Sequence, residues 1–356
     1  TGPVLASDIY GGETYDARLE RLGWASAGYD DRTWAPVARL DPPGSRLLAP
    51  ESPPVRRVGE LKPFTIRRAA SGETIVDLGQ NFTGWARLKV RGPAGTVVTL
   101  RFAEVLDRDG NLYTANLRRA NQTDRYTLRG GGEETYEPHF TFHGFRYVGV
   151  TGLPARADTG TITGIVVSSD LRQTGSFETS DSLLNRLQQN IVWGQRSNFL
   201  DVPTDCPQRD ERLGWTGDAQ VFAPTAAFNM DVAGFFAKWL GDVAADQDSS
   251  GSIPWVIPDV LDADSSRASG TAGWSDAAVS GVESFVCDGL RPPQRRGRVA
   301  ADAVSVRLPD PARPWRGAAG ITRSGDGRDR VAGGRRRAAG RITRARPPGP
   351  AEAPST

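Results

Sequence analysis

Cysteine and histidine are scarce in this chain of 356 residues, which has two of each. Two cysteines, Cys206 and Cys287, cannot form the disulfide framework of a small secreted domain, and we expect both to be free thiols. The two histidines, His139 and His143, lie four residues apart, and the sequence suggests no third ligand to complete a metal site. The sequence therefore predicts no metal centre, and the fold must depend on buried apolar side chains.

Long apolar runs are also missing. No stretch approaches the ~20 apolar residues that a membrane-spanning helix needs, so we expect no membrane partner. The first residues lack the charged-then-apolar pattern of a secretory signal, which leaves the compartment open. The formal net charge is only +2, so the total charge suggests no acidic partner. The oligomeric state is equally open.

The charge is unevenly distributed, because residues 281–356 contain 16 Arg, no Lys and 7 acidic residues. This part of the chain is rich in Arg, Pro, Gly and Ala, and it shows neither a helical nor a strand period. We therefore interpret residues 280–356 as a tail. It is either the translation of a GC-rich gene in a shifted reading frame or a naturally disordered segment. A nucleic-acid-binding arm is a third interpretation, which we favour least, so we expect no nucleic-acid partner.

The rest of the chain divides into three parts. Residues 1–60 are rich in Gly, Pro and Asp, and we interpret them as the end of an N-terminal β domain with a linker. Residues 63–170 contain short alternating segments such as "TIVDLG" and "VVTLRFAEVL", separated by turns, which predicts an antiparallel β-sandwich. Residues 171–279 change to a helical period.

Two helices are predicted in the third part. Residues 181–200 place apolar side chains on one helical face, with Asp181 as a candidate N-cap. Residues 231–247 repeat the pattern, with Asp231 as the candidate cap. The predicted apolar faces are Leu183, Leu184, Leu187, Ile191 and Val192 in the first helix, and Val232, Phe235, Phe236, Trp239, Leu240 and Val243 in the second.

Between these helices lies "DCPQRDERLGWTGD", residues 205–218, which holds four carboxylates, two arginines and a tryptophan. Pro203 and Pro207 exclude a regular helix here, so we expect a loop that displays functional groups. Carboxylates, arginine and indole suit the hydroxyls and C–H faces of a sugar, and a carboxyl kept protonated by like-charged neighbours can act as a general acid. A purely structural ion-pair network is the alternative.

The run "NFLDVPTDCPQRDERLGWTGDAQVFAPTAAFNMD" resembles the catalytic-domain signature of bacterial α-L-rhamnosidases. Upstream, "SDIYGGETYDAR" resembles the close of that family's N-terminal domain, and "VDLGQNFTGWARLKVRGPAGTVVTLRFAEVL" resembles its concanavalin-like β-sandwich. Downstream, "GSIPWVIPD" and "AGWSDAAV" resemble the next catalytic-domain blocks. The resemblance covers roughly residues 1–279.

The resemblance implies a multidomain β + α chain, in which a concanavalin-like β-sandwich precedes an incomplete (α/α)₆ barrel. It implies inverting hydrolysis of terminal α-L-rhamnose from glycosides, without a cofactor. By position, Glu211 is the general acid, and Asp210 is a candidate partner of an arginine. The residues expected to bind the sugar are Asp205, Arg209 and Asp218, which hold hydroxyls, and Trp215 and Trp274, which pack against the ring.

The general base is absent from this prediction, because the family's base lies late in the barrel and the resemblance stops near Val279. We therefore expect little or no hydrolase activity from the chain as written. Two alternatives stay open at this point. One is another (α/α)₆ glycosidase with a different sugar specificity, and the other is a non-catalytic carbohydrate-binding protein that uses the β-sandwich.

Overall fold

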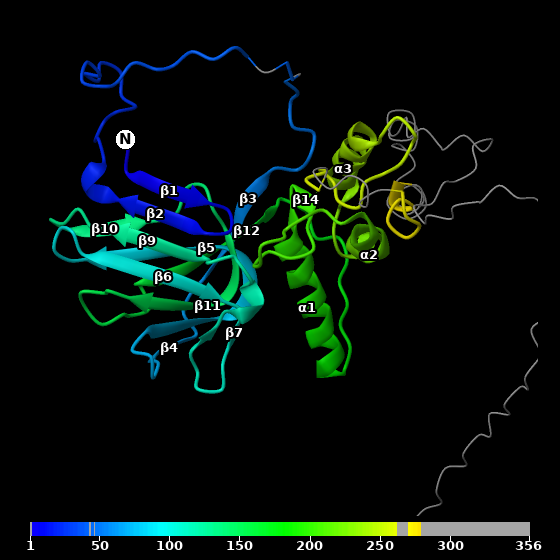
Figure 1. The fold of residues 1–356 in the computed structure, drawn as a ribbon. Coiled ribbons are helices and arrows are strands. Elements are labelled where there is room, and N and C mark those ends of the chain that lie inside the picture. The colour runs from blue at the N-terminus through cyan, green and yellow to red at the C-terminus, as the bar shows by residue number, and fades with distance from the viewer. Residues whose placement is uncertain (1, 43, 46, 262–269, 279–356) are drawn as a thin grey trace, which may run out of the picture. The chain divides into compact units, whose positions relative to one another are not determined.

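The structure, a computed structural model, describes residues 2–42, 44–45, 47–261 and 270–278 (Figure 1). The predicted tail of residues 280–356 lies outside the described residues. Within the described part, a large sheet precedes three helices (Figure 1). None of the described helices is long and apolar enough to cross a membrane.

Ten strands form one continuous sheet in the order β1-β2-β9-β6-β11-β5-β12-β3, with β4 and β10 also pairing with β5. They are β1 (Val4–Asp8), β2 (Gly12–Asp16), β3 (Val55–Leu61), β4 (Thr65–Arg68), β5 (Thr74–Arg91), β6 (Val97–Ala103), β9 (Thr123–Thr127), β10 (Glu133–Tyr136), β11 (His143–Thr151) and β12 (Ile162–Ser169). The short β7 (Val105–Leu106) and β8 (Leu112–Tyr113) form a separate hairpin. Two 3₁₀ turns, η1 (Ala17–Leu19) and η2 (Ala115–Leu117), complete this part.

The long strand β5 changes partners along its length. Its first half pairs with β4 and β11, whereas its second half pairs with β12 and β10. In β10 and along most of β6 alternate side chains are buried, as the sequence period predicts, whereas every residue of β12 is buried. The buried apolar side chains of these strands meet in one core. The ring of Phe145 lies in this core, with its centroid 4.5 Å from that of Phe82 and 4.7 Å from that of Phe102.

The first strands of the chain belong to the same sheet. β2 runs parallel to β9, with Tyr15 opposite Tyr126, and β3 pairs with β12. The segments before residue 62 are therefore joined to the β-sandwich by backbone hydrogen bonds, wherever domain limits are drawn in the sequence.

The helical part contains α1 (Ser182–Asn198), α2 (Thr216–Asn229) and α3 (Ala233–Asp246), with a two-residue pair of strands, β13 (Phe199–Leu200) and β14 (Val202–Pro203), after α1. The side chain of Asp181 accepts a hydrogen bond from the Leu183 amide, which confirms the predicted N-cap. The predicted cap at Asp231 is wrong, because Val232 holds that position and the Asp231 carboxylate pairs with Arg172 instead.

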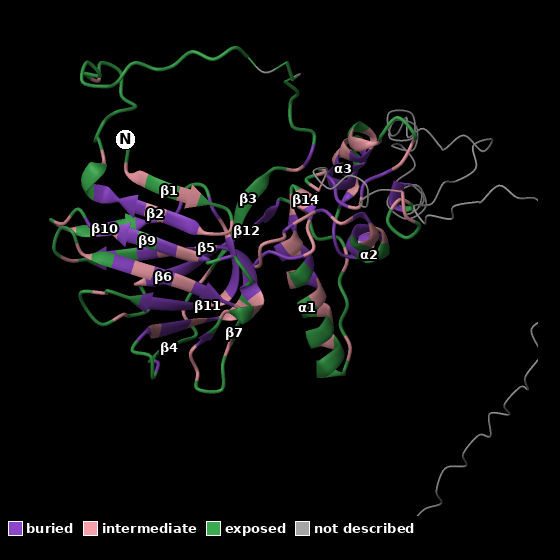
Figure 2. Cartoon of the chain, viewed as in Figure 1, coloured by how far each residue is buried: buried purple, intermediate pink, exposed green. Residues whose placement is uncertain are grey.

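The two predicted apolar faces, one on α1 and one on α3, differ in how far they are buried (Figure 2). The face of α3 is buried as predicted, with Phe236 and Trp239 at most 2% exposed. In α1 only the second half is covered: Val192 is buried, whereas Leu183 and Leu187 are 78% and 54% exposed. Helical period fixes which side chains share a face, but neighbours decide whether that face is buried.

The second half of α1 rests on the β-sandwich. Thr83 in β5 donates a hydrogen bond to the Ser197 carbonyl near the end of α1 (2.7 Å), and Trp193 packs against the core of the sheet. The chain that leaves α1 is thereby fixed against the sheet just before the stretch 205–218 begins.

Candidate active site

Residues 204–215 form the loop that the prolines predict, and Asp205 closes it. The Asp205 amide donates to the Leu213 carbonyl (3.0 Å), and the Leu213 amide donates back to Asp205 Oδ1 (2.9 Å). The other carboxylate oxygen of Asp205 accepts from Arg209 (2.8 Å). The Asp205 carboxylate, near the start of the loop, thus binds both Arg209 in its middle and Leu213 near its end. The carboxylates and the indole of this loop are therefore held in fixed positions.

Glu211 lies in the middle of this loop with both carboxylate oxygens occupied. Its Oε2 accepts from Arg209 Nε (2.9 Å) and from Arg118 Nη2 (2.8 Å), and its Oε1 accepts from the Trp215 indole N–H (3.0 Å). Glu211 therefore contacts two other predicted site residues, Arg209 and Trp215, directly. Arg118 is an addition, because it belongs to the β part of the chain.

The carboxyls of Glu211 and Asp218 are shifted in opposite directions. Burial alone would raise the pKa of Glu211, but the hydrogen bonds from Arg209 and Arg118 outweigh it and hold that pKa below its usual value. Burial raises the pKa of Asp218, and the charges of Asp205 and Glu211 raise it further. The carboxyl whose pKa is raised, by burial first and by like-charged neighbours second, is therefore Asp218, in the first turn of α2.

The two tryptophans come from different segments. Trp215 is half-buried and pairs through its backbone with Val256 of a later loop. The preceding residue must be glycine, because a β-carbon on Gly214 would overlap the Ile257 carbonyl oxygen. Trp274 is 38% exposed, and its indole lies 3.2 Å from the β-carbon position of Gly217. Trp215 is thus the N-cap residue of α2, and Trp274 lies against the first turn of the same helix, which contains Asp218.

Asp210, the neighbour of Glu211, pairs with arginines as the sequence suggested. Its carboxylate lies 2.7 Å from Arg118 Nε and accepts from Arg119 Nε (2.9 Å). The loop is also bound through its backbone, since the Tyr10 hydroxyl donates to the Glu211 carbonyl (2.9 Å). Sequence reasoning missed Tyr10, Arg118 and Arg119, because they lie about 90 to 200 positions from the loop in the sequence.

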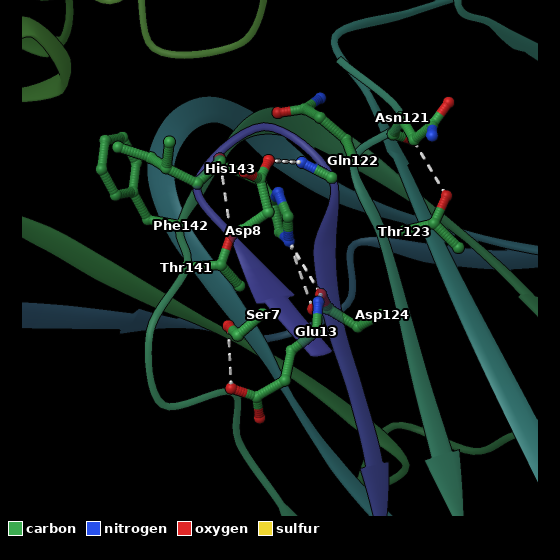
Figure 3. Close-up of polar contacts among 12 residues, drawn as sticks. Ser7, Asp8, Glu13, Asn121, Gln122, Thr123, Asp124, Thr141, Phe142 and His143 are labelled. Carbon is green, nitrogen blue, oxygen red and sulfur yellow. Dashed lines mark hydrogen bonds and ion pairs between the residues drawn. The ribbon is translucent and has the colours of Figure 1, made fainter. Parts of the chain in front are cut away.

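A cluster of polar residues that includes the buried Glu13, Gln122, Asp124 and His143 connects the β part to the loop (Figure 3). His143 Nε2 lies 3.1 Å from Asp124 Oδ1, and the Glu13 amide donates to the same oxygen (2.9 Å). Next to it, the Gly144 amide donates to Gln122 Oε1 (3.1 Å), an oxygen that also accepts from Arg212 of the loop (3.3 Å). The cluster joins the N-terminal strands, the sheet and the loop, so His143 has a structural partner.

Among the described residues, Asp205, Cys206 and Glu211 place ligand atoms within 4.8 Å of one another, close enough for a metal ion. The chemistry does not favour one. Asp205 and Glu211 already pair with Arg209. Burial raises the pKa of the Cys206 thiol to about 12, so the thiolate that binds metals does not form at neutral pH.

The described part of the chain has a β-sandwich followed by helices, and its carboxylates, arginines and indoles gather on the loop between the first two helices, an arrangement typical of a site that binds a sugar. The family models agree along the chain. Residues 1–59 match the alpha-L-rhamnosidase N-terminal domain, residues 67–168 the bacterial alpha-L-rhamnosidase concanavalin-like domain, and residues 172–285 the bacterial alpha-L-rhamnosidase 6 hairpin glycosidase domain. The chain belongs to the bacterial α-L-rhamnosidase family.

Named relatives share this similarity. The chain is 52% identical over 282 residues to an alpha-L-rhamnosidase of Streptomyces avermitilis, covering 79% of this chain and 27% of that protein. It is 44% identical over 283 residues to one of Formosa agariphila, covering 78% and 30%. The crystal structure of the Streptomyces avermitilis alpha-L-rhamnosidase complexed with L-rhamnose matches with a TM-score of 0.78 at 50% identity, over 85% of this chain and 29% of that one.

The chain thus spans less than a third of the length of these relatives. The described residues contain three α-helices, which is consistent with an incomplete helical barrel in a chain that spans this fraction of its relatives' length. The family assignment covers the β-sandwich and the start of the helical domain.

Proposed function

We propose that this chain carries the acid-side part of the active site of an inverting α-L-rhamnosidase, which removes terminal α-L-rhamnose from glycosides. The observation that carries the proposal is the Glu211 carboxylate, fixed by Arg209 and Trp215 inside a loop that Asp205 closes. The relative crystallised with L-rhamnose supports the choice of sugar.

Each predicted residue has a role in this proposal. Glu211 protonates the departing glycosidic oxygen, and the remaining side chains bind the sugar. Those side chains are Asp205, Arg209 and Asp218, which present groups to the hydroxyls, and Trp215 and Trp274, which offer apolar faces to the ring.

The proton of the acid needs an explanation, because the two guanidinium partners of Glu211 favour its carboxylate form in the free site. Glu211 must gain a proton when the glycoside is bound. Asp218, whose pKa is raised, is the competing proton donor. The experiment below therefore compares the two residues directly.

An inverting enzyme also needs a general base. This is a second carboxylate about 6.5–9.5 Å from the acid, with room for a water molecule between the two. We nominate no residue for this role, and the acidic residues from 283 to 352 lie outside the described part. We therefore expect the 356-residue chain to release little or no rhamnose by itself.

The proposal is tested in two proteins. Calorimetric titration of L-rhamnose into the chain itself should show weak binding, about millimolar, that Asp205→Asn weakens at least about tenfold. Asp231→Asn is the matched control, because that carboxylate forms a surface pair with Arg172. Absence of rhamnose binding, or equal binding by both variants, would contradict the proposed sugar site.

The acid is tested in a chimera, in which residues 1–278 are followed by the remaining part of the Streptomyces avermitilis relative. General-acid assistance contributes about 10²–10⁴-fold, so Glu211→Gln should lower kcat by that factor on a rhamnoside with a poor leaving group. The loss should be much smaller on a nitrophenyl rhamnoside. If Asp218→Asn shows this leaving-group dependence and Glu211→Gln does not, the acid is Asp218.

A further inference from the structure

A short segment of the β part, residues 118–122, has an uncommon backbone. It connects η2 to β9, and two of its residues, Arg118 and Gln122, have positive φ values of 57° and 42°. Left-handed backbone in residues other than glycine costs on the order of 1–3 kcal/mol each and persists where the surroundings enforce it. Only four such residues occur in the described part, and a third, Arg212, lies in the loop that this segment contacts.

The segment contacts three successive residues of the loop. Arg118 and Arg119 pair with Asp210, Arg118 also donates to Glu211, and Gln122 accepts from Arg212. The left-handed conformation at Arg118 reverses the chain after η2. Its guanidinium can then bridge two adjacent carboxylates at 2.7 and 2.8 Å. A surface ion pair formed by chance does not require a strained backbone or this match of consecutive residues.

We propose that Arg118 is a positioning residue for Glu211, so that the β-sandwich contributes directly to the active site. This inference rests on the proposed function, in which Glu211 is the acid. Arg118 and Arg209 together occupy Glu211 Oε2. The other oxygen, Oε1, has a single donor, the Trp215 indole. We assign the proton that is delivered to the sugar to Oε1.

The charges around Glu211 set the direction of the expected effect. Two cations, Arg118 and Arg209, contact the carboxylate, and the Asp218 carboxyl acts electrostatically against it. Asp205 and Asp210 carry further negative charge; Asp205 shares Arg209 with Glu211, and Asp210 also pairs with Arg119. Among the described residues, removal of Arg118 leaves Arg209 as the one cation in contact with Glu211, so the pKa of Glu211 should rise.

The test follows the titration of Glu211 by NMR in the full chain, labelled with ¹³C at the glutamate carboxyls, in buffer without sugar. Glu211→Gln identifies the signal. In Arg118→Gln the titration midpoint should move to higher pH, and Arg118→Lys should restore part of the shift, because it keeps a charge without the planar fork. The Arg118 side chain is 50% exposed, so these variants should fold.

Arg119→Gln is the matched control, because Arg119 contacts Asp210 and is 93% exposed. The Arg119→Gln variant should leave the titration midpoint of Glu211 unchanged. An unchanged midpoint in Arg118→Gln, or an equal shift in Arg119→Gln, would overturn the proposal. The titration of rhamnose is read separately. A failure to bind rhamnose while Arg118→Gln still shifts Glu211 counts against the proposed function alone, and an unshifted Glu211 with intact rhamnose binding counts against the role of Arg118 alone.

Discussion

Replacing Arg212 with methionine should release the loop that carries Glu211. Arg212 is 7% exposed, has a positive φ of 58°, and lies between the rings of Phe142 (4.9 Å) and Tyr10 (5.4 Å). Within the described part of the chain, its guanidinium donates hydrogen bonds to neutral oxygens. The acceptors are the carbonyls of Ile9 (2.7 Å), Phe142 (2.7 Å), Gln208 (3.1 Å) and Arg209 (3.2 Å), and Oε1 of Gln122 (3.3 Å).

The size of the effect follows from these contacts. Each buried acceptor left without a partner costs about 1–3 kcal/mol, although the costs are not additive and the Gln122 oxygen keeps the Gly144 amide. Burial lowers the pKa of Arg212 to about 10, so the charged side chain is itself expensive to bury and its removal returns part of the loss. We expect a net destabilisation of the loop of about 3 kcal/mol, or roughly a 100-fold larger open population.

Hydrogen exchange measured by mass spectrometry can detect this opening. The amides of residues 204–215, including the Leu213 amide that donates to Asp205, should exchange about 100-fold faster in Arg212→Met. Peptides from β6 and β11 provide the internal reference and should be unchanged. Arg212→Lys keeps the charge with fewer donors and should be intermediate. An increase of less than about tenfold in Arg212→Met would refute the reasoning, because water or neighbouring groups would then replace the guanidinium.

Three further predictions test the surroundings of the site. Gly144→Ala should destabilise the chain by about 1–3 kcal/mol in chemical denaturation, because its β-carbon would lie 2.7 Å from Pro207 Cγ; unchanged stability would show that the loop yields. In a variant without the other cysteine, Cys206 should react with iodoacetamide at pH 8 at least about 100-fold more slowly than in guanidinium chloride, since burial raises the pKa of its thiol to about 12; equal rates would contradict its burial. Burial alone would raise the pKa of Asp77, but the paired hydrogen bonds from Arg146 lower it, so the pair stabilises the fold above pH about 4 and the contribution is lost as the pH falls through the lower, folded-state pKa. Asp77→Asn should therefore lower the melting temperature at pH 7 and have a smaller effect near pH 2, and a constant difference would contradict this assignment.

Local sequence patterns predicted the β-sandwich and the buried face of α3, because alternation and helical period are properties of neighbouring residues. They missed α2, whose buried face includes small side chains, Ala219, Ala223 and Ala226, and whose interior contains Pro224. An alanine stripe lacks the contrast between apolar and polar positions on which a periodic pattern depends. The same limit applies to α1, where Leu183 has the right period and is nevertheless exposed.

The residues of the candidate site were predictable as a group, because the family signature holds most of them within fourteen positions, 205–218. Their contacts with the β part were not predictable. Arg118 is 93 residues from Glu211 in the sequence, and nothing in its neighbourhood distinguishes it from the other arginines of the chain. A contact of this kind depends on the three-dimensional fold, here on how the segment 118–122 leaves η2.

The opposite shifts of Glu211 and Asp218 show why composition alone does not identify the acid. The motif has four carboxylates and two arginines, and that count would leave any of the four as the protonated one. In the structure Arg209 contacts both Asp205 and Glu211, whereas Arg212 turns away to neutral oxygens. The second cation on Glu211 comes from the β-sandwich, and Asp218 forms no ion pair among the described residues. Where the guanidinium groups lie therefore helps to decide the direction in which each carboxyl's pKa is shifted. If Glu211 is the acid, substrate binding that weakened either arginine contact would raise the pKa of Glu211 and so favour its protonated form.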